Sequence, residues 1–548
     1  MLEVLRPRRL RIRTGRPLVI AVMGLLTATT LGVVALLAMG RLEVIDAIVL
    51  AAAPWALLAA AFRPDWLLLA LIAMPASLTT VIQTRKVVLL VGVALLALLV
   101  TRRGFRLGLG TGLAALAVVD VAGHLFLAHV GQDAMAVNQG AMLNLTYYVL
   151  LALLAFNLAV QGELDGDHLG AALVMGVWST LVVGLAGYGN AWFESGPDII
   201  THSYLAYLVA AALGVRLAQL IMTGDVASRS LGGLLLTGAL LCLAVLSVVR
   251  ASWIAVVITF ALLAFRSGRR RHVFVLMMAI LLALLTPTAR QQISRSESGD
   301  VVGQLRTGEI TTGRWELWTA LWEQAQQSLP WGNGFGYMWS LSSEDLVGSP
   351  DRYGSHESGV VPPHNDFIYL LVEFGIPGLL LLAFFWVQLF RAFSQVTQGA
   401  DALSRRSGWL FLGVLVTGLM VALFDDLFSV RPFAERFFPV AGFVFGLAQV
   451  ERARRRERAI RIPANATSAS SAAIPPDCGS CTRFTAVHTS RPGVRTHWRR
   501  DTQHSACAGA VVAQAITHPH PGARAMPAFI PGCRTPSCRS RRSAIRPR

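Results

Sequence analysis

The sequence predicts an all-α polytopic membrane protein, and three observations support this fold class. Hydrophobic residues make up 54% of the 548 positions and charged residues only 14%. The mean hydropathy is +0.56, so the chain has more apolar surface than a water-soluble fold can bury. Apolar stretches long enough for a helical span recur along the chain, and they predict about 14 transmembrane helices. No alternating pattern of the kind found in membrane β-barrels competes with them.

The chain begins with a basic segment, residues 1–16, which carries six arginines. The apolar run that follows, residues 17–39, is longer than that of a signal peptide, and no small-residue cleavage site comes after it. We therefore interpret it as an uncleaved first span with a cytoplasmic N-terminus. The later predicted spans cover residues 44–62, 66–82, 86–101, 107–130, 143–161, 169–189, 203–223, 231–249, 251–266, 272–288, 365–390, 407–427 and 433–450.

This pattern divides the chain into a helix bundle (17–290), a long periplasmic loop (291–363), C-terminal transmembrane helices (364–450) and a tail (451–548). Alternating sides along the chain places most clusters of Lys and Arg on the cytoplasmic side, as expected for membrane proteins. The C-terminus is then cytoplasmic too. The net charge of +17 is therefore assigned to membrane topology rather than to nucleic-acid binding.

The long loop is predicted to carry short amphipathic helices. After Arg314, tryptophans recur at Trp315, Trp318 and Trp322, a spacing typical of an amphipathic helix lying at the membrane interface. Arg314 at the start of this helix would lie beside open backbone amides and could bind an anion. The glycines at 332, 334 and 336 are predicted to form a turn, with a phosphate-binding nest as the less favoured alternative.

The same alternation places three further groups on the outer side. Arg250 lies between two apolar runs at the membrane surface, where a charged side chain is energetically costly unless it serves a function. Its guanidinium could bind phosphate oxygens. His364 follows two prolines, and Asn365 can cap the helix that begins there. A histidine at the positive end of a helix dipole favours the neutral imidazole, which could act as a base for a hydroxyl. Arg431 and Arg436 could pair with the nearby acidic residues at 425 and 426 or bind the substrate.

Other signals remain open. Asp120 and His124, one turn apart within a span, are either a structural pair or part of an ion or proton path. The composition from about residue 459 predicts a disordered tail, and five of the six cysteines lie there. Cys478 and Cys481 could open a zinc site, but the later cysteines lack ligand spacing. The sequence predicts neither a metal site nor a cofactor.

Two motifs carry a resemblance to a known family. They are Gly313-Arg314-x-x-x-Trp318 and, after the loop, His364-Asn365-x-x-x-x-Leu370-x-x-Glu373-x-Gly375-Ile376-x-Gly378. Over about residues 310–390 the chain resembles the O-antigen ligase and O-antigen polymerase superfamily of bacterial envelopes. Arg250 and the span count extend the resemblance more loosely to about residue 450.

The resemblance implies a metal-independent glycosyltransferase in the bacterial inner membrane. Such enzymes move a glycan from an undecaprenyl-pyrophosphate donor to an acceptor hydroxyl on the periplasmic side, and the acceptor can be lipid A-core, another glycan or a protein. Arg250 and Arg314 match the basic positions that hold the pyrophosphate. His364 matches the histidine that activates or orients the acceptor. The alternatives from other classes are a transporter or flippase of lipid-linked saccharides, centred on Asp120 and His124, and a scaffold protein without catalysis.

Overall fold

The structure is a computed structural model of the chain. It describes residues 62–75, 84–101, 105–108, 110–125, 132–186, 203–223, 229–247, 249–268, 314–341, 364–428 and 430–470. The predicted N-terminal segment 1–16, the spans 17–39 and 272–288, and the tail from residue 471 lie outside these ranges.

Every regular element in the described ranges is a helix, in agreement with the predicted all-α class. In chain order they are α3 (Pro64–Ala73), α5 (Thr84–Thr101), α6 (Gly112–Leu125), α7 (Gln132–Gln161), α8 (Gly166–Leu185), α9 (Ser203–Ala218), the π-helix η3 (Gln219–Thr223), α11 (Leu231–Leu246), α12 (Arg250–Arg266), α16 (Arg314–Ser328), the 3-10 helix η5 (Tyr337–Ser340), α18 (Asp366–Thr397), α19 (Ala402–Leu410), α20 (Leu412–Phe424) and α21 (Arg431–Ser470).

Six stretches among the described residues are helical, long and apolar enough to cross a membrane. They are Met142–Gln161, Gly166–Leu185, Ser203–Met222, Asp366–Thr397, Ala402–Phe424 and Arg431–Ala459. Three shorter helices, Pro64–Ala73, Gly112–Leu125 and Leu231–Leu246, are also apolar. The chain is therefore a membrane protein with several spans, and the total of about 14 stays a prediction.

Several helix ends differ from the predicted spans. In the span predicted at 107–130 the helix begins at Gly112, because a turn in which the Thr111 N–H donates to the Gly108 carbonyl precedes it. The span predicted at 407–427 is divided at Phe411 into α19 and α20. Helix α21 continues to Ser470, past the predicted end at 450. The Arg, Ala and Glu residues at 451–459 have high helix propensity, which favours its continuation through that stretch.

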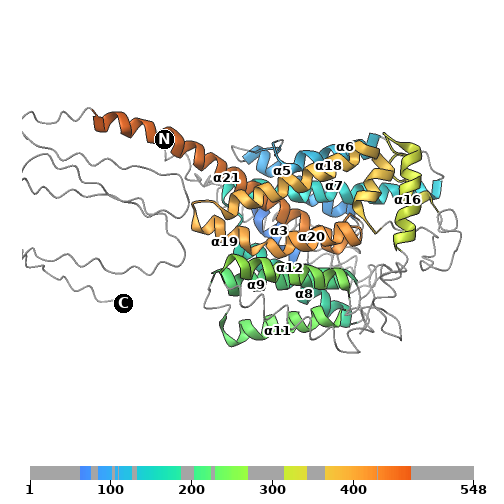
Figure 1. Cartoon of the computed structure of the whole chain (residues 1–548), viewed down its shortest axis with the longest axis horizontal. Coiled ribbons are helices and arrows are strands. Elements are labelled where there is room, and N and C mark those ends of the chain that lie inside the picture. The colour runs from blue at the N-terminus through green and yellow to red at the C-terminus, as the bar shows by residue number, and fades with distance from the viewer. Residues whose placement is uncertain are drawn as a thin grey trace, which may run out of the picture. The chain divides into compact units, whose positions relative to one another are not determined.

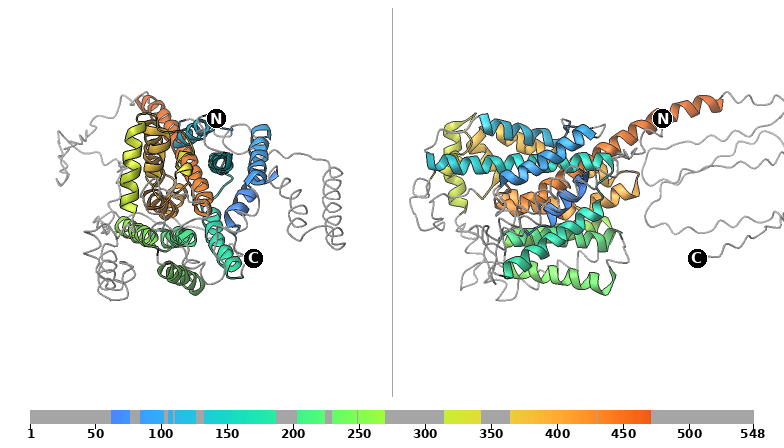
Figure 2. Two further views of the ribbon diagram at one scale, coloured as in Figure 1. Left: turned by 90° about the vertical axis from the view of Figure 1, so that its right-hand side faces the viewer. Right: turned by 180° about the vertical axis from the view of Figure 1, so that it is seen from behind.

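Most of the helices run side by side, and α16 lies across one end of them (Figure 1). Figure 2 shows α16 from two further sides. Helices α9 and α20 approach closely where Gly214 meets Gly413, since a Cβ at Gly413 would lie 2.5 Å from the Gly214 Cα. Small residues at such crossings are typical of helix packing in membranes.

The interior of the bundle is rich in aromatic side chains. Phe385 on α18 packs against Phe437, Phe438 and Phe445 on α21, with ring centroids 6.1–6.4 Å apart. All four rings are at most 1% exposed. This packing holds α18 and α21 together, so that the start of α18 and the connection between α20 and α21 lie at the same end of the bundle.

The chain divides into two units, Met1–Ile462 and Pro463–Arg548. All contacts discussed below lie in the first unit.

Candidate functional site

The candidate site is built around the start of α18, where Asn365 caps the helix as predicted. Its side-chain oxygen accepts hydrogen bonds from the backbone N–H groups of Phe367 and Ile368, at 2.9 and 3.1 Å. The residue before the cap, His364, has a positive φ of 49°. A non-glycine residue rarely adopts this conformation, and such strain clusters at functional sites.

Three consecutive residues at this helix start bind the end of α20 and the connection that follows it. The Asn365 Nδ2 donates to the Leu423 carbonyl at 3.0 Å, and the Leu427 N–H donates to Asp366 Oδ2 at 3.1 Å. Between these two contacts, His364 Nδ1 lies 3.0 Å from Asp425 Oδ1. The backbone at the start of α18 therefore fixes the position of His364, and the Asp425 carboxylate fixes the orientation of its imidazole ring.

Asp425 holds the imidazole in one tautomer. An ionised carboxylate only accepts hydrogen bonds, so His364 Nδ1 carries the proton and the neutral ring keeps the lone pair on Nε2. The other carboxylate oxygen, Asp425 Oδ2, accepts a hydrogen bond of 2.8 Å from the Tyr207 hydroxyl. The His364 side chain is 30% exposed and that of Asp425 is 11% exposed, so the ring is accessible while its partner is shielded.

The charge state of Asp425 follows from its surroundings. Burial alone would raise the pKa of this carboxyl group. The hydrogen bond and charge of His364, the charge of Arg314 and the Tyr207 hydroxyl outweigh burial and place the pKa of Asp425 below its ordinary value. The carboxylate is therefore ionised at neutral pH, as the tautomer argument requires.

Arg314 reaches the same helix end. It is the first residue of α16, as predicted, and its guanidinium donates a hydrogen bond to the Phe424 carbonyl, at the end of α20. A cation beside the last carbonyls of a helix is electrostatically favourable. Arg314 and His364 thus contact two adjacent residues at the end of α20, Phe424 and Asp425, although 50 positions separate them in the sequence.

Helix α16 is held on the bundle by an apolar stripe. Leu317, Leu321 and Ala325 are at most 1% exposed, and the helix packs against α18. Trp315 and Trp322 remain 63% and 49% exposed. The crosswise helix with exposed tryptophans agrees with the predicted amphipathic character, and its location at the membrane interface stays a prediction.

The glycine cluster after α16 forms a turn that docks on α18. The N–H groups of Asn333 and Gly334 donate to the carbonyls of Val372 and Glu373, each at 2.9 Å. In return the Ile376 N–H donates to the Pro330 carbonyl at 2.9 Å. This confirms the turn and disfavours the phosphate nest, because two of the amides that such a nest would use are already bonded within the protein.

The docking depends on a break in α18 at Gly375, which has φ 63° and ψ −150°. A Cβ there would lie 2.0 Å from the Pro330 carbonyl oxygen, so only glycine fits. We call this arrangement, Pro330–Gly334 against Val372–Ile376, the α18 clamp. It fixes α16, and with it Arg314, relative to the helix that begins beside His364.

Arg250 lies at the same end of the bundle. Helix α11 begins beside the end of α9, because Arg216 donates to the Gly233 carbonyl at 3.1 Å. It then runs back along α9 for about 24 Å, and the chain turns into α12 at Arg250. The course of these helices places Arg250 near the start of α9, the end at which Tyr207 of α9 donates to Asp425.

Arg431 and Arg436 both pair with Glu435. Their distances to the Glu435 carboxylate are 2.8 and 3.1 Å. Arg436 also donates to the carbonyls of Pro432 and Met74, which ties α21 to the end of α3. The Arg436 side chain is 1% exposed and so presents no face to a substrate, whereas that of Arg431 is 15% exposed. Substrate binding by these two arginines stays a prediction, and we leave Arg436 out of the proposed site.

Asp120 and His124 are connected through a third residue. The Thr146 hydroxyl lies 2.9 Å from Asp120 Oδ1 and 3.1 Å from His124 Nε2. The His124 side chain is 47% exposed. This cluster joins α6 to α7, and the structural interpretation of the pair accounts for its geometry.

Sequence analysis did not identify Asp425 as the partner of His364, nor Tyr207 as a member of the site. Asp425 was noted in the outer connection, but its expected partners were arginines. No local signal marks Tyr207, which lies within an apolar span. Among the described residues, no group of three or more His, Cys, Asp or Glu side chains could hold a metal ion. Metal independence stays a prediction.

The comparisons with known proteins bear on this site directly. No curated protein matches the chain. Residues 235–383 match the family model described as O-antigen ligase, and this range contains Arg250, Arg314 and His364. This match over residues 235–383 supports the resemblance of the chain to the O-antigen ligase and polymerase superfamily.

Proposed function

We propose that this protein is a metal-independent glycosyltransferase of the bacterial inner membrane. It moves a glycan from an undecaprenyl-pyrophosphate donor to an acceptor hydroxyl on the periplasmic side, as an O-antigen ligase or a polysaccharide polymerase. The acceptor is lipid A-core, another glycan or a further hydroxyl-bearing molecule. The observation that carries the proposal is the meeting of His364, Asp425 and Arg314 at the end of α20.

His364 has the geometry of a general base in this proposal. With Nδ1 protonated and bound to Asp425, Nε2 takes the proton from the acceptor hydroxyl as its oxygen attacks the anomeric carbon of the donor. The bond from that carbon to the pyrophosphate oxygen breaks, and the lipid pyrophosphate leaves with the bonding electrons. Asp425 stabilises the imidazolium that forms, as a carboxylate does in other catalytic arrangements with histidine.

The arginines stabilise the leaving group. A guanidinium offers five N–H donors in a planar fork, which suits phosphate oxygens, and one bond from Arg314 to a backbone carbonyl leaves other donors for an anion. Arg314 also begins α16, where the helix dipole favours negative charge. Arg250 adds a second guanidinium at the same end of the bundle, and Arg431 is the remaining partly exposed candidate.

The direct test is glycan transfer by the full-length protein in liposomes that contain an undecaprenyl-pyrophosphate glycan and an acceptor. We expect transfer by the native protein and loss of transfer in His364→Ala. His168→Ala is the matched control, because His168 lies in the first turn of α8 with a side chain that is 74% exposed. Equal activity of His364→Ala and His168→Ala would refute the role of His364.

The second candidate function is a transporter or flippase of lipid-linked saccharides. The contact of Asp120 and His124 with Thr146 supports it, because hydrogen-bonded ionisable residues within membrane helices mark proton or substrate paths. In the same liposomes, movement of the lipid-linked glycan between leaflets that is abolished in Asp120→Asn and retained in His364→Ala would favour this function over glycosyl transfer.

A further inference from the structure

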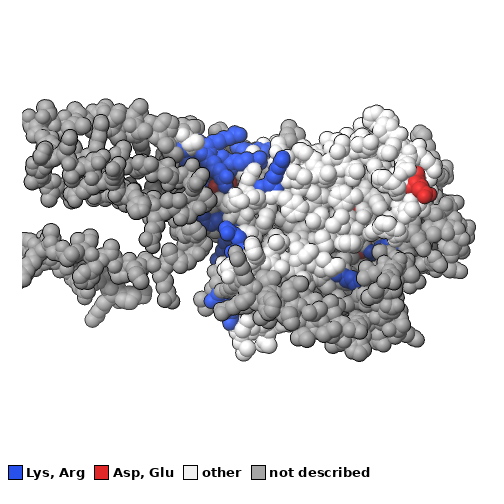
Figure 3. Space-filling view, in the orientation of Figure 1, with Lys and Arg blue, Asp and Glu red and all other residues white. Residues whose placement is uncertain are grey.

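A second charged surface lies at the end of the bundle where α21 leaves it. The space-filling view in Figure 3 shows Lys and Arg side chains gathered at this end. Residues 391–406 and 451–458 contain eight arginines and three carboxylates. We call these arginines the arginine collar: Arg391, Arg405, Arg406, Arg452, Arg454, Arg455, Arg456 and Arg458.

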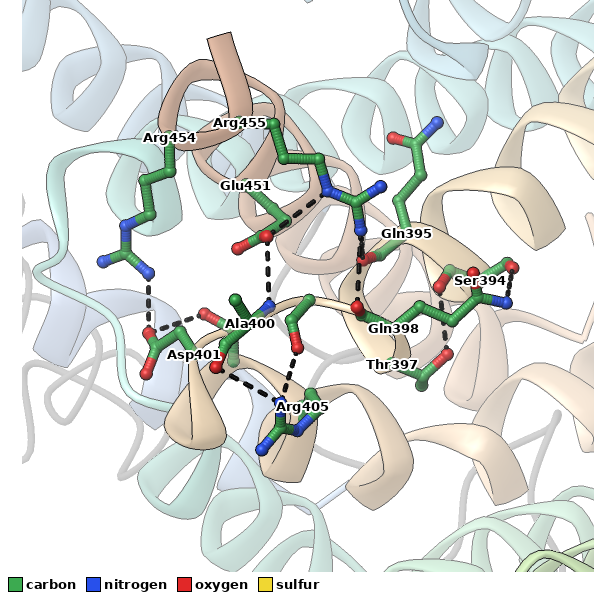
Figure 4. Close-up of polar contacts among 12 residues, drawn as sticks. Ser394, Gln395, Thr397, Gln398, Ala400, Asp401, Arg405, Glu451, Arg454 and Arg455 are labelled. Carbon is green, nitrogen blue, oxygen red and sulfur yellow. Dashed lines mark hydrogen bonds and ion pairs between the residues drawn. The ribbon is translucent and has the colours of Figure 1, made fainter. Parts of the chain in front are cut away.

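Half of the collar is engaged within the protein. Figure 4 shows Arg405 donating to the Ala400 carbonyl and Arg455 donating to the Gln395 carbonyl, at the end of α18. Arg454 pairs with Asp401 at 2.6 Å. These arginines cap a helix C-terminus or neutralise a carboxylate, which is a structural role.

Arg406 is engaged as well, because it pairs with Asp167 at 3.1 Å. Arg455 has a second partner in Glu451, at 3.4 Å. Two of the three carboxylates in the collar region are therefore already neutralised by collar arginines.

The other half of the collar has no partner among the described residues. Arg391, Arg452, Arg456 and Arg458 make neither a hydrogen bond nor an ion pair there. Arg391, Arg456 and Arg458 are exposed. The exposed part of the collar is thus an excess of positive charge that the protein itself does not neutralise.

The face of α18 that leads to the collar identifies the chemistry of the ligand. Leu380, Phe384 and Val387 are 62%, 45% and 48% exposed. They precede Arg391 by eleven, seven and four positions, so all four side chains lie on one face of the helix. An exposed apolar stripe ends in a guanidinium, which matches a molecule with an acyl chain and an anionic headgroup.

We infer that the unpartnered, exposed arginines of the collar bind anionic phospholipids, with phosphodiester headgroups at Arg391, Arg456 and Arg458 and an acyl chain along the α18 stripe that leads to Arg391. A free phosphate would make no use of the apolar stripe. A nucleic acid would have to lie against residues that face acyl chains. Basic residues beside membrane helices attract anionic headgroups, and each contributes about a fivefold factor in affinity. This inference is independent of the proposed glycosyl transfer.

The test is lipid binding to the full-length protein in neutral detergent, followed by native mass spectrometry. Phosphatidylglycerol and phosphatidylcholine with the same acyl chains are compared. We expect phosphatidylglycerol to bind at least about tenfold more tightly. The variant with Arg391→Gln, Arg456→Gln and Arg458→Gln should lose this preference, with a loss of affinity on the order of tenfold to a hundredfold.

Two control variants separate charge from structure. Replacing the same three arginines by lysine keeps the charge and should keep the lipid preference. Arg405→Gln removes an arginine that is engaged with backbone carbonyls, so it should lower the melting temperature and leave the preference in place. An unchanged preference in the triple Gln variant, or an equal affinity of the native protein for both lipids, would overturn the inference.

A third arm distinguishes the source of the phosphate. Inorganic phosphate at the same concentration as phosphatidylglycerol should not displace the bound lipid, because it cannot contact the apolar stripe. Displacement by inorganic phosphate would show that the collar binds the anion alone and would refute lipid binding.

Discussion

Asp425→Asn is the sharpest test of the candidate site, because it changes one oxygen to nitrogen and keeps the shape of the side chain. In the native protein Asp425 Oδ1 lies 3.0 Å from His364 Nδ1. A hydrogen bond to a charged group is worth about 1.5–3 kcal/mol. Since about 1.4 kcal/mol corresponds to a factor of ten in rate, loss of this bond alone predicts a fall in turnover of about tenfold to a hundredfold.

A second effect acts in the same direction. The amide of Asn can turn its NH₂ group toward His364 Nδ1, and the proton of the neutral ring then moves to Nε2. This tautomer cannot accept a proton from the acceptor hydroxyl. We therefore expect the fall in turnover to lie at the upper end of the range, near a hundredfold.

The assay is initial-rate glycan transfer in proteoliposomes over a range of pH and acceptor concentration. Tyr207→Phe is the graded control, since it removes only the 2.8 Å hydrogen bond to Asp425 Oδ2 and leaves the carboxylate in place. We expect it to lose less than about tenfold. A merely structural role of Asp425 would lower the melting temperature without changing the pH profile of turnover. Turnover of Asp425→Asn within about threefold of the native rate, with His364→Ala inactive, would refute the orienting role.

Three further predictions concern stability, measured as thermal unfolding in detergent. Gly375→Ala should destabilise the protein by more than about 3 kcal/mol, because it adds backbone strain and breaks hydrogen bonds of the α18 clamp. The control is Gly238→Ala, whose Cβ would meet nothing within 4 Å, so this substitution should be neutral or stabilising. Equal melting temperatures of Gly375→Ala and Gly238→Ala would contradict the account of the clamp. Arg436→Met should cost about 3 kcal/mol by leaving Glu435 with one partner in a buried site, and no loss would show that the pair is dispensable. The pKa of Asp425 lies below its ordinary value of about 3.9, so its contribution is fully present above that pH and is lost as the pH falls through the lower folded pKa. The stability difference between the native protein and Asp425→Asn should therefore shrink below about pH 4, and a constant difference down to about pH 3 would contradict this.

The α18 clamp connects the fold to the proposed chemistry. It holds the turn after α16 against the break in α18, so the start of α16 and the start of α18 are fixed relative to each other. Arg314 stands at one of these starts and His364 precedes the other. Substitutions in the clamp are expected to affect both groups together, although no clamp residue touches either of them in the contacts described.

Local patterns in the sequence were enough to predict the membrane class, the cap at Asn365 and the start of a helix at Arg314. Each of these depends on residues within a few positions of one another, because hydrophobic runs and helix ends are properties of neighbouring residues. The same patterns misplaced several helix ends: the span predicted at 407–427 corresponds to α19 and α20, which cover Ala402–Phe424 with an interruption at Phe411.

The partners of charged residues depended on packing between distant helices. His364 and Asp425 are 61 positions apart, and Arg436 reaches a carbonyl 362 positions away. Periodicity assigns a residue to a face of its helix, but it does not say which other helix covers that face. The sequence therefore named three groups that could serve one reaction, and only the close packing of α9, α18 and α20 joined the imidazole to its carboxylate.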